Sequence, residues 1–208
     1  VQIISLGGAT PAQVSAFFTA YKIKGFNAVE LSGAAECVRI KNKPLEYTQK
    51  GIYMYLKPEH LELWFPAALL CSSINIPVYI CTQRSENMNI IQHLGLSLDL
   101  DRETATESLK YCKMCVSFPT NNQIQRNIHT TLEELEFENF FDYALALAYP
   151  IEPLGLIFEA EHKFLEIYED ALRISNIPTA LIMTEEDDVM LINGDMKSIK
   201  GKLDLSNH

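Results

Sequence analysis

Several features that would mark a familiar protein class are scarce in these 208 residues. The five cysteines are few and odd in number, which argues against a disulfide framework and favours a reducing compartment. No apolar run approaches the ~18 residues of a membrane span, and the chain does not open with a basic segment followed by an apolar stretch. We therefore expect a cytoplasmic protein without membrane contact, although the start at Val1 leaves open a removed upstream segment.

Motifs for well-known chemistry are also missing. The glycine pair Gly7-Gly8 lacks the third spaced glycine of a dinucleotide fingerprint and the Gly-Lys-Ser/Thr of a P-loop. Neither a Gly-x-Ser-x-Gly elbow nor a His-Glu-x-x-His zinc motif occurs. The sequence therefore indicates no cofactor and leaves the reaction open. Glu30 or Glu185 would be the first choice for a general base if there is one.

Net charge is missing from the first half of the chain. Residues 1–104 hold 9 acidic and 9 basic side chains, whereas residues 105–208 hold 18 acidic and 8 basic ones. An acidic field repels phosphate backbones, so we expect no general nucleic-acid binding. The one basic concentration is predicted to be a solvated face of a hairpin and comprises Arg39, Lys41, Lys43, Lys50 and Lys57.

The beginning of the chain is typical of a strand, a helix and a second strand. The apolar run Val1 to Leu6 stops at glycines, which suits a buried strand. Thr10, Pro11 and Gln13 form a capping box with proline at the first helical position, and Gly25 closes the helix. Asn27 to Leu31 then predicts a second strand, parallel to the first.

Two short stretches a hundred residues apart leave a helix in the same way. "SINIPVYICT" (73–82) and "ISNIPTALIMT" (174–184) each pass through Asn-Ile-Pro into an apolar run that ends on threonine. Proline disfavours helical backbone in the residue before it, so Asn-Ile-Pro predicts a joint from helix to strand.

The other expected elements follow from apolar periodicity and turn residues. They are a hairpin or meander over 37–57, helices at 58–69, 85–94, 101–113, 133–148 and 156–174, a strand at 114–118, and a final hairpin over 179–193 with its turn at Glu185 to Asp188. Together they predict one domain over 1–208. Its class is α/β: three-layer, Rossmann-like, with a mainly parallel sheet, an inserted or edge β-hairpin and a helical, acidic C-terminal half.

Small polar residues follow the predicted parallel strands. Ligands of open α/β sheets bind outside the carboxyl ends of the strands, and a free helix N-terminus there favours anions. Arg84 would supply the cation. The candidate ligand-binding residues are Gly7, Gly8, Ser32, Thr82, Arg84 and Thr184. Tight turns and helix caps would account for the same residue types without any ligand.

Three further motifs favour structural interpretations. Cys112 and Cys115 have CxxC spacing but no second pair of ligands, so we expect reduced, largely buried thiols without metal. Glu159-x-x-His162 lacks the second copy that a di-iron bundle needs, and His162 with Glu166 is predicted to be an exposed helical pair. The acidic turn at 185–188 lacks the ligand pattern of a calcium loop.

Two hypotheses of different classes remain open. In the first, the chain binds a small anionic ligand, nucleotide-like or phosphorylated, at the carboxyl edge of its parallel sheet, with chemistry undetermined. In the second, it is a noncatalytic interaction, inhibitor or regulatory module whose acidic second half meets a basic protein partner.

Overall fold

The computed structural model describes residues 2–5, 8–83, 88–98, 100–118, 140–184, 188–194 and 199–202. Within them a seven-stranded sheet has the order β3-β2-β1-β4-β5-β6-β7. The five strands β1 (Gly51–Leu56), β2 (Val78–Thr82), β3 (Met114–Ser117), β4 (Pro153–Glu159) and β5 (Thr179–Met183) are parallel. Strands β6 (Asp188–Asn193) and β7 (Ile199–Lys202) run antiparallel to their neighbours. The mainly parallel sheet and the final hairpin are as predicted.

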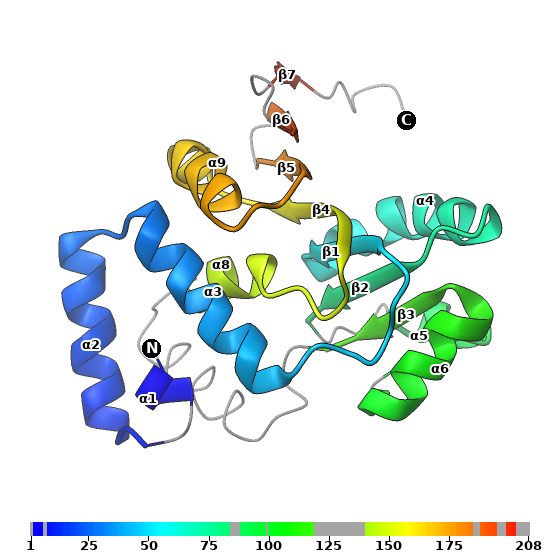
Figure 1. The fold of residues 1–208 in the computed structure, drawn as a ribbon, viewed down its shortest axis with the longest axis horizontal. Helices are drawn as coiled ribbons and strands as arrows, with labels where there is room; N and C mark the ends of the chain where they lie inside the picture. Colours follow the sequence, from blue (N-terminus) through cyan, green and yellow to red (C-terminus); the bar gives the residue numbers. More distant parts are fainter. Residues whose placement is uncertain are drawn as a thin grey trace.

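Helices cover both faces of the sheet (Figure 1). One face packs under α3 (Ala28–Asn42), α8 (Phe140–Leu147), α9 (Leu165–Ile174) and α6 (Arg102–Cys112), with Tyr53, Phe158 and Ile182 in its core. The other packs under α4 (Leu61–Ser73) and α5 (Asn89–His93), with Met54, Ile80 and Val116 in its core. Successive residues of the parallel strands alternate between these two cores, as the period of a strand requires.

The described part of residues 1–42 forms three helices and no strand, which corrects two strand predictions. The run at 1–6 contains α1 (Gln2–Ser5), and the run at 27–31 begins α3. Asn27 and Glu30 form a capping box, with 2.9 Å from the Glu30 N–H to the Asn27 side chain. Apolar runs of four to eight residues do not distinguish strand from buried helix by periodicity. The expected parallel pairing of 1–6 with 27–31 is therefore wrong.

Helix α2 (Pro11–Lys24) begins as predicted. The Gln13 backbone N–H donates to Thr10 Oγ1 at 3.3 Å, and the Thr10 N–H donates to Gln13 Oε1 at 2.9 Å. Pro11 takes the first helical position, and Gly25 ends the helix at φ 77°. Both partners of the capping box satisfy backbone groups that the helix leaves without an internal partner.

Both Asn-Ile-Pro joints are confirmed and share one geometry. Asn75 and Asn176 adopt left-handed backbone at φ 68° and 53°. The N–H of the following isoleucine then donates to a carbonyl five residues earlier, Ile76 to Cys71 and Ile177 to Leu172, each at 3.0 Å. This is the Schellman bond of a helix end, and β2 and β5 begin directly after each proline.

Two longer predictions were wrong because the chain pairs over long distances. The hairpin expected over 37–57 is the end of α3, a loop and β1, whose neighbours are β2 and β4. The helix expected over 156–174 is β4, the 3-10 turn η4 (His162–Phe164) and then α9. Of the helix expected over 133–148, the structure describes only α8, and residues 133–139 lie outside the described residues.

Candidate functional site

The strand order changes direction between β1 and β4. Chain connections run from β1 toward β2 and β3 on one side, and from β4 toward β5 on the other. Ligands of open α/β sheets bind outside the carboxyl ends of the strands at such a switch point. At this point β1 leads into Lys57 and the 3-10 turn η1 (Pro58–His60), and β4 leads into Ala160 and Glu161.

Glu159, the last residue of β4, connects the two strand ends. Its Oε1 lies 2.8 Å from His60 Nδ1 and accepts a hydrogen bond from the Lys57 backbone N–H at 3.3 Å. The Glu159 side chain is only 11% exposed, whereas that of His60 is 48% exposed. The carboxylate therefore fixes the loop after β1 and leaves the imidazole accessible to solvent.

Glu161 lies two residues further and has its own partners. Lys163 Nζ is 2.5 Å from its Oε2, and the Tyr143 hydroxyl donates to its Oε1. Burial raises the pKa of Glu161, but the hydrogen bonds from Lys163 and Tyr143, with the charges of Lys163 and Lys57, outweigh burial and hold that pKa below its ordinary value. The carboxyl group is therefore ionised at neutral pH.

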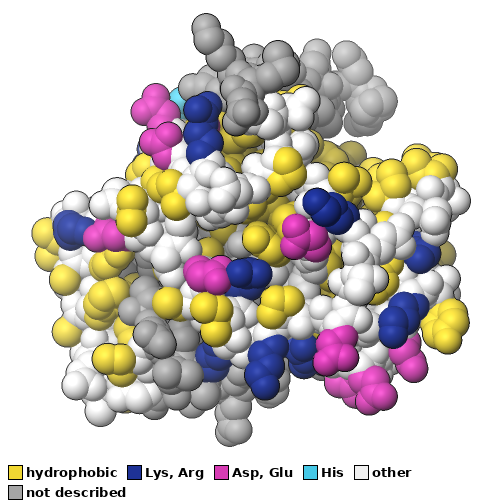
Figure 2. Space-filling model, viewed as in Figure 1, with side chains coloured by type: hydrophobic (Ala, Val, Ile, Leu, Met, Phe, Trp, Pro, Cys, Tyr) yellow, Lys and Arg dark blue, Asp and Glu magenta, His cyan; other side chains and the backbone are white. Residues whose placement is uncertain are grey.

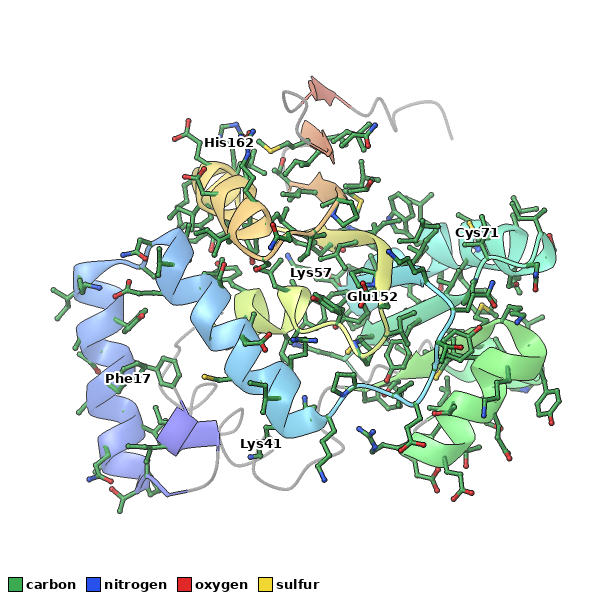
Figure 3. The ribbon with its side chains drawn as sticks, viewed as in Figure 1. Phe17, Lys41, Lys57, Cys71, Glu152 and His162 are labelled. Atoms are coloured by element: carbon green, nitrogen blue, oxygen red, sulfur yellow. The ribbon has the colours of Figure 1, made fainter. Side chains whose placement is uncertain are left out.

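An aromatic cluster holds Tyr143 in place. Its ring lies 5.1 Å from that of Phe164 and 5.7 Å from that of Phe26, and Phe26 and Phe164 are 4.8 Å apart. These rings come from α8, η4 and the link between α2 and α3. Figure 3 labels Lys57, near the middle of the molecule, and His162, just before the start of α9. The switch point thus gathers two carboxylates with Lys57, His60 and Lys163.

The predicted ligand-binding residues are only partly brought together. Thr82 is the last residue of β2, and Thr184 directly follows β5. Both are buried and lie at the same edge of the sheet as Glu159. Thr82 is 0% exposed, and its Oγ1 has no hydrogen-bond partner in the described part of the chain. A role for these two threonines in ligand binding stays a prediction.

The other four predicted residues do not join them. Ser32 lies inside α3, where its hydroxyl donates to the Ala171 carbonyl at 3.0 Å and so joins α3 to α9. Gly8 follows α1, and its N–H donates to the Ile3 carbonyl at 3.0 Å, as in a tight turn. Neither is at a strand end, because the strands expected before them are helices. Gly7 and Arg84 lie outside the described residues.

The residues that sequence reasoning missed are Lys57, His60, Glu159 and Glu161. Lys57 was assigned to a hairpin and Glu159 to a helix, so neither was placed at a strand end. A signal was available in "PLGLIF" (153–158). This stretch is a short apolar run that begins with a proline, and short continuous apolar runs are typical of strands buried on both faces.

The cysteine pair and the Glu-x-x-His motif lie in different environments from those expected. Cys115 is buried in β3, and burial raises its pKa to about 12, so it remains a thiol. Cys112 is exposed at the end of α6, so the prediction that both thiols are buried is wrong for Cys112. Glu159 and His162 lie on a strand and a 3-10 turn, not on one helix. The turn at 185–187 lies outside the described residues.

The structure places Arg39 of the basic stretch but only part of the acidic half. Arg39 lies on α3, not in a hairpin, where it pairs with Glu36 at 2.7 Å and stacks on Tyr149. Glu133, Glu134, Glu136 and Glu138 lie outside the described residues, so a basic partner for the acidic half stays a prediction. Among the described helices, none is long and apolar enough to cross a membrane.

Comparisons with known proteins agree with this architecture. A family described as "Glycosyl transferase family, helical bundle domain" matches residues 1–40, which form α1, α2 and most of α3. The structure of anthranilate phosphoribosyltransferase from Thermus thermophilus superposes with a TM-score of 0.83 at 14% identity, over 97% of this chain and 67% of that chain. The chain therefore has the anthranilate phosphoribosyltransferase fold.

Sequence relatives carry the same description. The anthranilate phosphoribosyltransferase of Methylorubrum extorquens (strain PA1) is 25% identical over 162 residues, covering 73% of this chain and 48% of the relative. That of Shouchella clausii is 23% identical over 222 residues, covering 97% and 63%. The chain thus spans about half to two thirds of their length. A Saccharomyces cerevisiae relative in complex with PRPP and Mg superposes with a TM-score of 0.73 at 13% identity, over 92% of this chain and 60% of that chain.

Proposed function

We propose that this chain binds a phosphoribosyl ligand of the PRPP type at the carboxyl ends of β1 and β4. One observation carries the proposal: Lys57 and His60 follow the first strand at the switch point of a fold whose Saccharomyces cerevisiae relative is described in complex with PRPP and Mg. This refines the small phosphorylated ligand expected from the sequence. The proposal concerns ligand binding only, and transfer of the phosphoribosyl group would need its own assay.

Side-chain charge, more than backbone, would hold the phosphates. Gly-rich loops cradle phosphates with backbone N–H groups, but the segment after β1 is Lys57-Pro58-Glu59-His60, without glycine and with a proline that has no N–H. Lys57 is the cation at this position, the half-exposed His60 offers a ring N–H, and Lys163 stands close by on Glu161. Ammonium groups form charge-assisted hydrogen bonds with phosphate oxygens, and a ring N–H donates to them as well.

A magnesium ion would enter with the phosphates. Among the described residues, no three His, Cys, Asp or Glu side chains are grouped to hold a metal by themselves. Mg²⁺ commonly keeps several waters and binds one or two carboxylates together with substrate phosphates. Glu159 and Glu161 are the two carboxylates that would hold it, and the ion would neutralise phosphate charge beside them.

Isothermal titration calorimetry with PRPP and MgCl₂ tests the proposal. We expect saturable binding that weakens about tenfold or more in Lys57→Ala and in His60→Ala, because each loses a hydrogen bond to phosphate. Arg173→Ala is the matched control, since Arg173 pairs with Glu169 on α9, away from the strand ends, and should bind PRPP as the unaltered chain does. Folded protein that gives no binding heat would refute the proposal, as would equal affinity in all variants.

A further inference from the structure

Lys163 is an exposed lysine that contacts two neighbours in its own turn. Its Nζ lies 2.5 Å from Glu161 Oε2 and 4.8 Å from the centre of the Phe164 ring. Yet its side chain is 65% exposed, against 31% for that of Glu161. Figure 2 shows acidic and basic side chains gathered beside a histidine above α9, at the upper left, where Figure 3 labels His162. The ammonium group of Lys163 therefore lies on the solvent side of the Glu161 carboxylate.

The Glu161 carboxylate, in contrast, is fixed from the protein side. The Tyr143 hydroxyl donates to its Oε1, and the Tyr143 ring is buried against Phe26 and Phe164. The Phe164 N–H donates to the Glu161 backbone carbonyl at 2.9 Å, which closes the η4 turn. The carboxylate therefore keeps its orientation whichever cation lies on Oε2.

Glu159 offers a second oxygen at the same end of β4. Its contacts with His60 Nδ1 and with the Lys57 backbone N–H are both made by Oε1. In the described part of the chain, Oε2 is thus the Glu159 oxygen that remains for a metal. The carboxyl end of β4 presents one carboxylate oxygen without a cation and one that Lys163 covers.

The ion pair of Lys163 and Glu161 is of a kind that exchanges easily. Exposed lysine–carboxylate pairs add little to stability, because water screens them and the long lysine side chain loses freedom in forming them. A divalent ion at the same distance attracts the carboxylate twice as strongly as an ammonium group does, because the Coulomb energy is proportional to charge. A magnesium ion can therefore compete with Lys163 for Oε2.

We propose that Lys163 holds the place of the magnesium ion on Glu161 until ligand binds. The inference rests on the proposed function, which puts Mg²⁺ on Glu159 and Glu161. Lys163 leaves Oε2 when Mg²⁺ enters with the phosphates, and its ammonium group is then free to donate to a phosphate oxygen. One lysine thereby balances the carboxylate charge in the ligand-free protein and phosphate charge in the complex.

A magnesium titration without PRPP tests this inference. The carbon NMR signal of the Glu161 carboxyl group, assigned with Glu161→Gln, reports Mg²⁺ at that group. We expect Lys163→Gln to bind Mg²⁺ there about fivefold or more tightly than the unaltered chain, because no internal cation reduces the fraction of free carboxylate. Lys163→Arg keeps a cation on Oε2 and should bind Mg²⁺ no more tightly than the unaltered chain.

Lys24→Gln is the matched control for the loss of charge. Lys24 is 60% exposed and pairs with Glu30 at the end of α2, so this variant loses one positive charge and keeps the contact between Lys163 and Glu161. Its Mg²⁺ affinity at Glu161 should stay within about twofold of that of the unaltered chain, because salt screens exposed charges. Equal affinities in Lys163→Gln and the unaltered chain would overturn the inference, as would an equal gain in Lys24→Gln.

The calorimetry with PRPP and this titration can fail separately. If PRPP does not bind but the Glu161 signal responds to Mg²⁺ in the expected order of variants, the proposed function is refuted and the exchange of Lys163 for Mg²⁺ is supported. If PRPP binds but the Glu161 signal does not respond to Mg²⁺, the exchange alone is overturned.

Discussion

Thr82 is a buried polar side chain at the carboxyl edge of the sheet. It is completely buried at the end of β2, and its hydroxyl has no partner among the described residues. A buried hydroxyl without a hydrogen bond costs roughly 1–3 kcal/mol. Thr82→Val keeps the shape of the side chain and should therefore raise the free energy of unfolding by about 1 kcal/mol, as measured by urea denaturation.

Titrating PRPP into the same variant tests whether the Thr82 hydroxyl contacts the ligand. If the hydroxyl contacts ligand, Thr82→Val will be more stable and will bind PRPP more weakly. A variant that is less stable than the unaltered chain would show that the hydroxyl has a partner after all.

Glu161 gives the molecule a pH dependence of known sign. Its pKa is held below the ordinary value of 4.5, so its ionised form stabilises the fold above that pH, and this contribution is lost as the pH falls through the folded-state pKa. Tyr143→Phe removes one of its hydrogen bonds and should raise the pKa of Glu161, moving the loss of stability to higher pH. Carbon NMR of the carboxyl group measures this directly. Tyr47→Phe is the control, because Tyr47 bonds to Gln49, and no change in the pKa of Glu161 should follow.

At the scale of elements, β1 has no room for a side chain at its first residue, Gly51. A Cβ on Gly51 would lie 2.6 Å from the Pro77 carbonyl oxygen and 2.8 Å from Ile151 Cδ1. Gly51→Ala should therefore destabilise the protein by about 1–3 kcal/mol, as overpacking does. Gly155 on β4, in register with Ile52, has room for a methyl group, since its nearest neighbour would be Thr179 O at 3.6 Å. Gly155→Ala should change the unfolding free energy by less than about 0.5 kcal/mol in the same urea titration. Equal losses in the two variants would contradict this account.

Elements with local signals were predictable, and those that depend on distant partners were not. The capping box of Thr10 and Gln13 and the joints at Asn75 and Asn176 are settled by neighbouring residues, so their geometry followed from sequence. The run at 27–31 was decided by the Asn27 cap and by packing against α8 and α9. β1 is a strand because β2 and β4 flank it, and no pattern within 37–57 records those partners.

The candidate site was predictable as an edge but not as a set of residues. The carboxyl ends of parallel strands were expected to carry it, and Thr82 and Thr184 do lie there. Glu159 and His60, which are in contact, are about a hundred residues apart in sequence. Such a pair becomes visible only once the order of β1 and β4 is known.

For the whole molecule, salt tests the hypothesis of a basic protein partner. The Debye length falls from about 10 Å at 0.1 M salt to about 3 Å at 1 M. Attachment of a basic protein to the acidic half, which carries 18 acidic and 8 basic side chains, should therefore weaken over this range in a binding titration. An affinity that does not change with added salt would contradict an interface held by opposite charges. The single domain expected over 1–208 stays a prediction.

The central position of β1 also has a consequence for how the chain folds. Its pairing with β4 joins Ile52 to Gly155, so one edge of the middle strand of the parallel part of the sheet stays open until about a hundred further residues have left the ribosome. Contacts so distant in sequence slow folding, because the long loop must close before any of them forms. Helices α1 to α3 can form early from local signals, whereas the sheet can only be completed late. During synthesis, the unpaired edge of β1 is therefore exposed to aggregation until β4 pairs with it.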